Sequence, residues 1–555
     1  MQKYISLLLI VFLISCNNKK EYDTIIRNGM IYDGNGGVPY KGDIAINADT
    51  IVAIGDLKDF SAKNEIEANG KAIAPGFINM MGHSEEALFQ DGRSQSDLRQ
   101  GVTTEIFGEF SMGPLNAKMK EQLQKGQGDI KYKVNWNTLG EYMNVLEKKG
   151  VSCNIASFVG TGTIRQYVIG EDNKDPDAQQ LDSMKLLVDQ AMKEGALGVT
   201  NALIYPPDFF AKTNELIALS KEAAKYGGMY TSHMRSEGNK LLEAVEELIT
   251  ISKEANIPAE IFHLKAAGKN NWNKMDSLIR IVDEARKKGL NITADMYTYI
   301  AGATGMTSAF PPTLQDGGFG KLWQRLHDPA IRKQMIQAMN TDAKDWENLY
   351  YGSDGADHVL MLSFKQDSLK KYTGKTLAEV AKLRGTSPEE TAMDLIIQDS
   401  TRVGVAYFMI NEDNVKKEIA LPWVSFGSDE ASYTNEGVFL KSNAHPRAYG
   451  NFVRVLGKYS RDEKTIPLQE AVYKLAKLPC TNLKIAKRGE LKVGNYADVV
   501  IFDPAKVTDH ATFDKPHQYA TGIMHVFVNG GQVIKNGDHT NAKPGRFLKG
   551  PGYKK

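Results

Sequence analysis

The sequence predicts an α/β protein: a (β/α)8 TIM-like barrel with a small β-sandwich domain built from both chain ends. Between about residues 75 and 482, eight apolar strand-like runs alternate with amphipathic helical stretches, as in a parallel barrel. Short alternating runs with Asn-Gly turn signals lie before this region and again after it. The length of 555 residues, with 42% hydrophobic residues, suits one large domain and a smaller one.

Residues 1–16 have the features of a bacterial lipoprotein signal peptide. Lys3 precedes an apolar run, residues 5–14, that is too short to span a bilayer. The run ends in Leu13-Ile14-Ser15-Cys16, which resembles a lipobox, so Cys16 is the expected lipidation site and residues 17–21 a polar tether. A plain signal peptide with a chance cysteine is the alternative. The first interpretation predicts a lipid-anchored protein of the bacterial cell envelope, facing the periplasm or on the outer membrane.

The β-sandwich domain is expected over residues 22–74 and 483–555. Five strand-like runs precede the barrel and two longer alternating runs follow it: 22–27, 30–32, 42–46, 50–55, 66–73, 494–502 and 523–534. Two half-sets of strands that flank a long middle region indicate one domain assembled from both ends of the chain.

The barrel is expected over residues 75–482. Its eight predicted strands are 77–81, 102–107, 154–159, 197–201, 229–232, 259–262, 291–294 and 423–426, and clear helices include 182–194, 214–226 and 241–255. Residues 302–421 are too many for one βα loop and contain strand-like runs of their own at 359–364 and 403–410. We expect an insertion that covers the barrel mouth.

The overall charge gives no indication of a polyanionic partner. Lysine and arginine number 68 and aspartate and glutamate 67, so nothing draws the chain to nucleic acid, and membrane contact is expected through the lipid anchor only. Cys153 and Cys480 both lie in apolar contexts and are expected to be buried without a disulfide.

Polar residues capable of binding a metal stand at the ends of six predicted strands. In a (β/α)8 enzyme the chemistry lies at the carboxyl ends of the strands. The residues found there are His83, Glu109, His233, His263, Asp295 and Asp429. Imidazole and carboxylate groups that converge on one mouth are what a Zn²⁺ site with an open water position requires, so a zinc site is predicted.

Several motifs resemble the amidohydrolase superfamily and, within it, the N-acyl-D-amino-acid deacylases (D-aminoacylases). The superfamily's opening is similar to Pro75-Gly76-Phe77-Ile78 with His83, and to Gly101-Val102-Thr103-Thr104. The narrower matches are GALGVTNALIYPP (195–207), GGMYTSHMRSE (227–237), HLKAAGKNNW (263–272), ADMYTY (294–299), GSD (427–429) and HPRAYG (445–450). The resemblance covers nearly everything after the signal peptide, and it implies a metal-dependent hydrolase of linear amides.

Two departures from the family pattern bear on the metal. The superfamily begins its site with His-x-His, but the first position here is Met81, whose thioether suits Zn²⁺ poorly. Glu109 stands where this branch has a bridging cysteine, and a carboxylate is an acceptable ligand. We therefore expect one tightly bound Zn²⁺ on Glu109, His233 and His263, with His83 and Asp429 able to complete a weaker second position.

The resemblance also implies the reaction and its remaining residues. Asp429 is expected to be the general base toward a metal-activated water, and Arg447 of the HPR motif, with Lys265 and Tyr297, to bind the substrate. The predicted reaction hydrolyses N-acyl-D-amino acids to a carboxylate and a D-amino acid. A D-residue dipeptidase, another amidohydrolase reaction and a non-catalytic binding lipoprotein are the alternatives.

Overall fold

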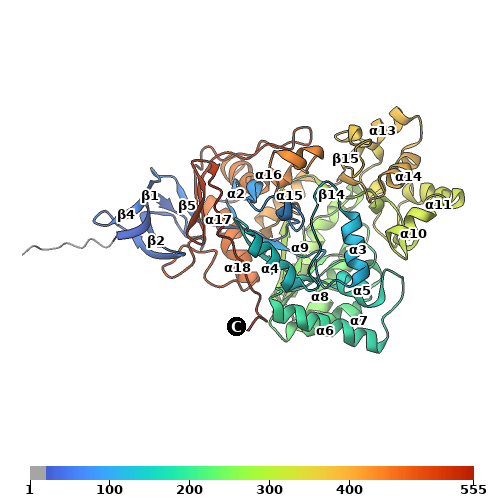
Figure 1. Ribbon diagram of the computed structural model, residues 1–555, viewed down its shortest axis with the longest axis horizontal. Coiled ribbons are helices and arrows are strands. Elements are labelled where there is room, and N and C mark those ends of the chain that lie inside the picture. Colours follow the sequence, from blue (N-terminus) through green and yellow to red (C-terminus); the bar gives the residue numbers. More distant parts are fainter. Residues whose placement is uncertain (1–20, 555) are drawn as a thin grey trace, which may run out of the picture.

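The computed structural model describes residues 21–554 and contains three parts along its long axis. The β-rich domain lies at one end, the barrel in the middle, and the insertion, in yellow and light orange, at the other end (Figure 1). The predicted lipobox and most of the tether, residues 1–20, lie outside the described residues.

The β-rich domain is a nine-stranded sheet made from both chain ends. Its strands are β1 (Glu21–Ile31), β2 (Tyr40–Asn47), β3 (Thr50–Gly55), β4 (Ser61–Glu67), β5 (Ala72–Pro75), β18 (Val499–Phe502), β19 (Ile523–Val528), β20 (Gly531–Lys535) and β21 (Asp538–His539). The order is β21-β20-β19-β18-β5-β1-β2-β3, with β4 also paired to β1. The antiparallel pairing of β5 with β18 joins the two ends, for example at Ala74 opposite Val500. Residues from both ends, among them Ile44, Ile73 and Ile501, form one buried apolar cluster.

Two strand predictions in this domain were wrong in detail. The runs 22–27 and 30–32 are one strand, β1, whose register shifts between Ile26 and Gly29. The run 66–73 is the end of β4, a turn, and then β5. Asn69 and Gly70 have φ of 51° and 74°, a left-handed pair that interrupts the strand. The chain keeps its direction across this turn, because β4 and β5 both pair in parallel with β1.

The eight predicted barrel strands are all present. They are β6 (Phe77–Asn79), β7 (Val102–Phe107), β8 (Asn154–Ser157) with its continuation β9 (Val159–Gly160), β10 (Gly198–Ala202), β11 (Met229–His233), β12 (Ala259–Ile261), β13 (Ile292–Met296) and β17 (Val424–Phe426). All pairings are parallel, in the orders β6-β7-β8 and β17-β13-β12-β11-β10-β9. Met80 N donates to Phe426 O at 3.1 Å, which links β6 to β17. The (β/α)8 fold class is thereby confirmed.

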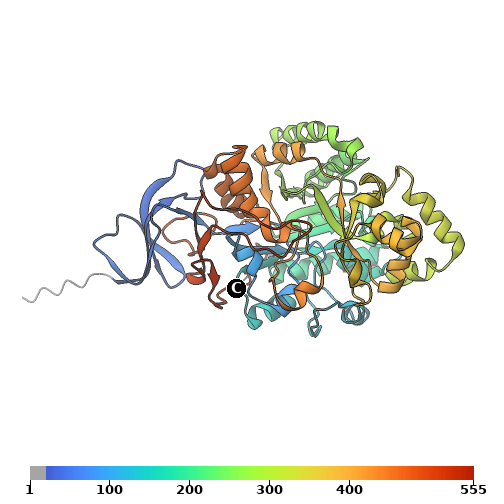
Figure 2. The same ribbon diagram turned by 90° about the horizontal axis from the view of Figure 1, so that it is seen from above.

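Amphipathic helices surround these strands, as Figure 2 shows from above. Asp177 caps α6 (Ala178–Glu194) by accepting from Gln180 N, and Gly195 ends the helix at φ 112°. Leu216 of α7 (Thr213–Ala224) and Val245 of α8 (Leu241–Ala255) are fully buried in the main core. The other helices of this region are α1 (Ala87–Gln90), α2 (Gln95–Leu98), α3 (Ala117–Gly126), α4 (Leu139–Lys149), α5 (Thr161–Ile169), α9 (Met275–Lys287), α15 (Glu412–Ala420), α16 (Arg447–Arg454), α17 (Leu468–Val472) and α18 (Leu478–Asn482).

The segment between β13 and α15 forms a subdomain of its own. It contains a three-stranded antiparallel sheet, in the order β14 (Ala301–Gly305), β16 (Gly404–Phe408), β15 (Val359–Ser363). Its helices are α10 (Phe319–Arg325), α11 (Pro329–Met339), α12 (Leu349–Gly352), α13 (Leu377–Arg384) and α14 (Pro388–Asp399). Because β14 begins five residues after Met296 ends β13, the subdomain lies at the carboxyl ends of the barrel strands.

The last residues return to the barrel. Gly545 N donates to Val151 O at 2.9 Å, Leu548 N to Ile155 O at 2.8 Å, and Gly550 N to Gly195 O at 2.9 Å. A Cβ at Gly545 would lie 1.9 Å from Cys153 O, so only glycine permits this approach. The chain end is therefore packed against β8 and the loop before β10. Cys153 and Cys480 are both buried and free.

Candidate metal centre

The six strand-end residues lie at one mouth of the barrel. His83 follows β6, Glu109 follows β7, His233 ends β11, His263 follows β12, Asp295 is in β13, and Asp429 follows β17. His263 and Asp429 have φ of 36° and 50°, a left-handed backbone that is unfavourable for residues other than glycine. The surrounding strands therefore hold both residues in a strained backbone conformation.

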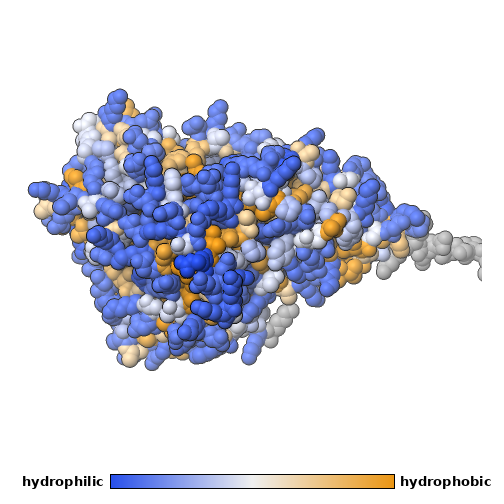
Figure 3. Space-filling view, turned by 180° about the vertical axis from the view of Figure 1, so that it is seen from behind, coloured by the Kyte–Doolittle hydropathy of each residue, from blue (hydrophilic) through white to orange (hydrophobic). Residues whose placement is uncertain are grey.

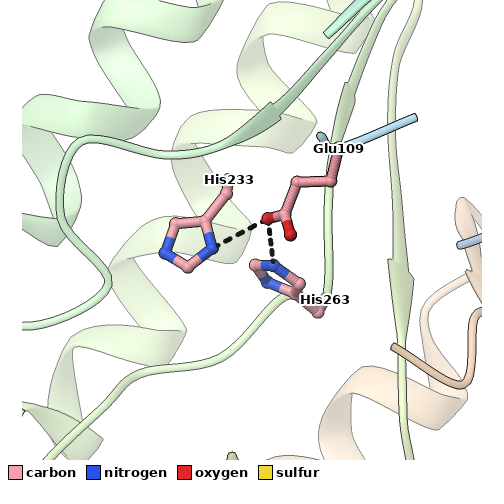
Figure 4. Close-up of side chains that lie close together, drawn as sticks. All are labelled: Glu109, His233 and His263. Atoms are coloured by element: carbon pink, nitrogen blue, oxygen red, sulfur yellow. Dashed lines mark hydrogen bonds and ion pairs between the residues drawn. The ribbon is translucent and has the colours of Figure 1, made fainter. Parts of the chain in front are cut away.

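Glu109, His233 and His263 form a buried cluster of three donors (Figure 4). Glu109 Oε1 lies 3.2 Å from His233 Nδ1 and 3.5 Å from His263 Nε2, and the three donor atoms lie within 4.8 Å of one another. Burial acts to raise the pKa of Glu109, but hydrogen bonds with the two histidines outweigh it and lower the pKa to about 2. One carboxylate and two imidazoles around a common point are a suitable ligand set for a divalent metal.

A second cluster shares Glu109 and adds His83 and Asp429. His83 Nε2 lies 3.1 Å from Asp429 Oδ1 and 3.6 Å from Glu109 Oε2. Met81 does not join it: the side chain is 2% exposed and belongs to an apolar cluster in the barrel interior with Ile78 and Ile106. Met81, the residue expected at the first histidine position, is thus part of the core.

Glu237 was not predicted as a site residue, yet it lies behind both histidines. Its Oε1 is 2.9 Å from His263 Nδ1 and 2.6 Å from Lys265 Nζ, and its Oε2 is 3.8 Å from His233 Nε2. A carboxylate behind a metal-binding histidine fixes the ring's tautomer and orientation. His263 Nδ1 also lies 2.7 Å from Lys265 Nζ, so Glu237 and Lys265 together hold this side of the ring. Nε2 is left to face Glu109, and the residues present fit a metal. The signal in the sequence was its place at the end of the motif GGMYTSHMRSE, four residues after His233.

Asp295 contacts the backbone beside the metal-binding cluster and belongs to neither donor cluster. Its Oδ1 accepts from the backbone N of His263 at 3.0 Å. Burial raises the pKa of Asp295 to about 7. This strand-end carboxylate therefore holds the loop that carries His263.

Arg447 lies directly against Asp429. Its Nη1 is 2.7 Å from Asp429 Oδ2, its Nη2 donates to Asp429 O, and its Cζ is 4.4 Å from the centroid of the Tyr297 ring. Burial acts to raise the pKa of Asp429, but Arg447, His263 and His83 outweigh it and hold that pKa well below its usual range. Asp429 is consequently ionised.

Two cavities meet at His83 and Asp429. One, of about 270 Å³, contains the three-donor cluster together with Lys265, Tyr297, Tyr205 and residues of the insertion. The other, of about 520 Å³, is lined by Arg447, Glu430, His445 and His517. An extended substrate can therefore lie across the cluster with one end in each cavity.

A sequence profile described as the amidohydrolase family matches residues 64–534. The chain belongs to this family. Among individual proteins, it is 28% identical over 540 residues to D-aminoacylase from Alcaligenes xylosoxydans xylosoxydans, a match covering 96% of this chain and 99% of that protein.

Solved amidohydrolase structures agree with this assignment. A crystal structure of D-aminoacylase superposes with a TM-score of 0.79 at 29% identity, covering 95% of this chain and all of that one. N-acyl-D-glutamate deacylase from Bordetella bronchiseptica, complexed with zinc and a phosphonate mimic of the tetrahedral intermediate, gives 0.79 at 26% identity, covering 96% and 100%. Another D-aminoacylase structure concerns a binuclear metal centre with one-metal activation and second-metal attenuation. This amidohydrolase is therefore a metal-dependent amide hydrolase that uses a divalent ion.

Proposed function

We propose that the protein hydrolyses N-acyl-D-amino acids with one tightly bound Zn²⁺ held by Glu109, His233 and His263. The observation that carries the proposal is the buried three-donor cluster with Glu237 behind its histidines. The substrate class is supported by the relatives, which are named D-aminoacylase and N-acyl-D-glutamate deacylase. A second, weaker metal position would use His83 and Asp429 with Glu109.

When bound, the zinc ion would supply a water of lowered pKa and a Lewis acid for the amide carbonyl. Asp429 would accept a proton from the attacking water at Oδ1 and return it to the leaving amine. His83 Nε2, 3.1 Å from that oxygen, orients the carboxylate. Arg447 fixes the other oxygen, so Asp429 cannot rotate away from the cluster.

The free carboxylate of the substrate would be bound by Arg447, Lys265 and Tyr297. Among the described residues, Arg447 Nε and Tyr297 Oη are buried without a hydrogen-bond partner, and Lys265 Nζ lies 5.4 Å from the centroid of the Tyr297 ring. A guanidinium beside a phenol hydroxyl suits a carboxylate.

The location that we propose is the bacterial cell envelope, through a lipid on Cys16. No helix within residues 21–554 has the length and apolar character of a membrane span. The face drawn in Figure 3 is predominantly hydrophilic, with small apolar patches between charged groups.

The direct test uses the purified chain without residues 1–16. Zinc content is measured by elemental analysis, and turnover is measured on matched N-acyl-D- and N-acyl-L-amino acids and on D-residue dipeptides. We expect one tightly held zinc per chain and turnover of the N-acyl-D-amino acids. Turnover of the dipeptides alone would replace this proposal by a dipeptidase.

A further inference from the structure

The insertion brings a cation, Arg402, into the cavity that contains the three-donor cluster. Of the residues lining this cavity of about 270 Å³, residues 302–305, Leu349, Arg402 and Met409 come from the insertion. The other lining cation, Lys265, lies 2.6 Å from Glu237 and is already assigned above to the free carboxylate of the substrate. Arg402 stands just before β16, in the segment over the barrel mouth.

Contacts along one side fix the Arg402 guanidinium. Its Cζ lies 4.7 Å from the centroid of the Tyr205 ring, and its Nε donates to Thr307 Oγ1 at 3.0 Å. Tyr205 is itself held by a 2.8 Å hydrogen bond between its hydroxyl and Thr304 Oγ1. A Cβ at Gly305 would lie 2.7 Å from Arg402 Nε, so the absence of a side chain there gives the guanidinium its room.

The terminal nitrogens of Arg402 have no anionic partner in residues 21–554. No carboxylate of those residues forms an ion pair with this guanidinium, and the one hydrogen bond from its side chain is made by Nε. Arg447 and Arg454, by contrast, pair with Asp429 at 2.7 Å and with Asp509 at 2.9 Å. A half-buried guanidinium without a partner, held over an aromatic ring in a cavity, is a receptor for a planar anion.

Arg402 and Arg447 flank the cluster from different sides. Tyr205 and Phe110, which line the wall at Arg402, follow β10 and β7. Tyr297 and Arg447 follow β13 and β17, on the other side of the ring of strands. A substrate whose α-carboxylate is bound by Arg447 would therefore extend past the cluster toward Arg402.

We propose that Arg402 binds a second carboxylate of the substrate, so that the preferred substrates are N-acyl amino acids with two carboxylates. This proposal rests on the proposed function. The second carboxylate belongs either to the amino-acid side chain or to the acyl group, and both present the same chemistry to a guanidinium.

The test compares carboxylate substrates with their neutral amides. For the side chain the pair is N-acetyl-D-glutamate and N-acetyl-D-glutamine; for the acyl group it is N-succinyl-D-alanine and its terminal amide. In the metal-loaded wild type we expect kcat/KM to favour the carboxylate of one pair by about 10- to 100-fold, the usual effect of a charge-assisted hydrogen bond. Arg402→Gln should abolish the preference for the carboxylate substrate. The substrate pair in which the preference is lost shows whether the second carboxylate belongs to the amino-acid side chain or to the acyl group.

Arg384→Gln is the matched control, because it removes an arginine of the same insertion whose side chain contacts Gln398 and Tyr372 outside the cavity. It should keep the wild-type preference. Binding of the four compounds, measured by calorimetry, gives a readout that does not need turnover. If none of the four compounds is hydrolysed, the proposed function fails. The Arg402 site is still supported in that case if the two carboxylate compounds bind more weakly to Arg402→Gln than to wild type. The proposed Arg402 site is wrong if Arg402→Gln prefers the carboxylates as strongly as wild type does. It is also wrong if wild type shows no preference for a carboxylate over its amide.

Discussion

Asp429 and Glu109 are both carboxylates at the barrel mouth, but their surroundings differ. Asp429 is bound by Arg447 and His83, whereas Glu109 lies between the two histidines of the three-donor cluster. The contacts of Asp429 fix a proton acceptor beside the proposed position of the attacking water, whereas those of Glu109 suit a metal ligand. Their amide variants should therefore separate proton transfer from metal binding.

Asp429→Asn keeps the size of the side chain and removes its basic oxygen. General acid and base catalysis are each worth about 10²- to 10⁴-fold, so kcat should fall by at least about 100-fold while zinc content stays near wild type. Glu109→Gln should lose zinc and activity together, because a neutral amide is a poor zinc ligand. Elemental analysis and steady-state kinetics of both variants measure this. Near-normal turnover by Asp429→Asn would refute the role of Asp429 as base.

Glu237 should act on metal affinity through His263 and His233. Loss of a carboxylate behind a metal-binding histidine typically costs about 10- to 100-fold in metal affinity or activity, and we expect that loss for Glu237→Gln in a competition titration with a chelator. Glu215→Gln is the matched control, since it breaks the equally buried Arg165–Glu215 pair at 2.6 Å. The control should lower stability and leave zinc affinity unchanged. Equal zinc affinity in the two variants would show that Glu237 is merely structural.

The strand-end residues could be predicted because parallel strands carry their carboxyl ends to one mouth. His83, Glu109, His233, His263, Asp295 and Asp429 follow from that rule alone. Tyr205 and Glu237 lie in the matched motifs 195–207 and 227–237, but no periodicity in those loops fixes the direction of a side chain, so neither was predicted as a site residue. Arg402 lies in the insertion, outside the matched motifs. The contact of Arg447 with Asp429 depends on how α16 packs, which the HPR motif does not specify.

At the scale of elements, strand positions were predictable where apolar runs ended at a turn. The interruption of the third barrel strand at Phe158 was not, because residues 154–159 are all buried and contain no glycine or proline. The run 66–73 contains apolar residues on both sides of Asn69 and Gly70, which favours one continuous strand. The two segments do run in the same direction along β1, but the left-handed pair between them breaks the strand into β4 and β5.

The C-terminal end of α15 is capped by a lysine from another element. Lys474 Nζ is buried and donates to the carbonyl oxygens of Ile419 and, at 2.6 Å, of Leu421. Cations are favoured at helix C-termini, but burial lowers the pKa of Lys474 to about 7. The same lysine titrates near 10.4 in an unfolded chain.

Between about pH 7 and 10, unfolding should therefore take up a proton at Lys474. The free energy of unfolding contributed by this site should rise with pH across that window and be lowest below pH 7. Lys474→Met should remove this rise, seen as a smaller increase in Tm from pH 7 to pH 10 than in wild type. The exposed Lys193→Met should keep the wild-type profile. Parallel pH profiles for Lys474→Met and wild type would contradict the lowered pKa.

At the scale of the whole molecule, membrane attachment should depend on Cys16 alone. The thiol is the expected anchor point because Leu13-Ile14-Ser15-Cys16 resembles a lipobox. Cys16→Ser should leave the protein unlipidated and move it from the membrane to the soluble fraction, as followed by fractionation and mass spectrometry. A variant that stays in the membrane fraction would rule out the lipoprotein hypothesis.

The pairing of β5 with β18 has a consequence for the order in which the protein matures. Strands β1 to β5 are synthesised first, but their neighbour in the sheet is made more than 400 residues later. Until then the edge of β5 and apolar residues such as Ile73 lack the partners that bury them. Contacts of such sequence separation form slowly, and exposed strand edges promote aggregation. The free edge of β5 is therefore exposed to mispairing until β18 has been synthesised.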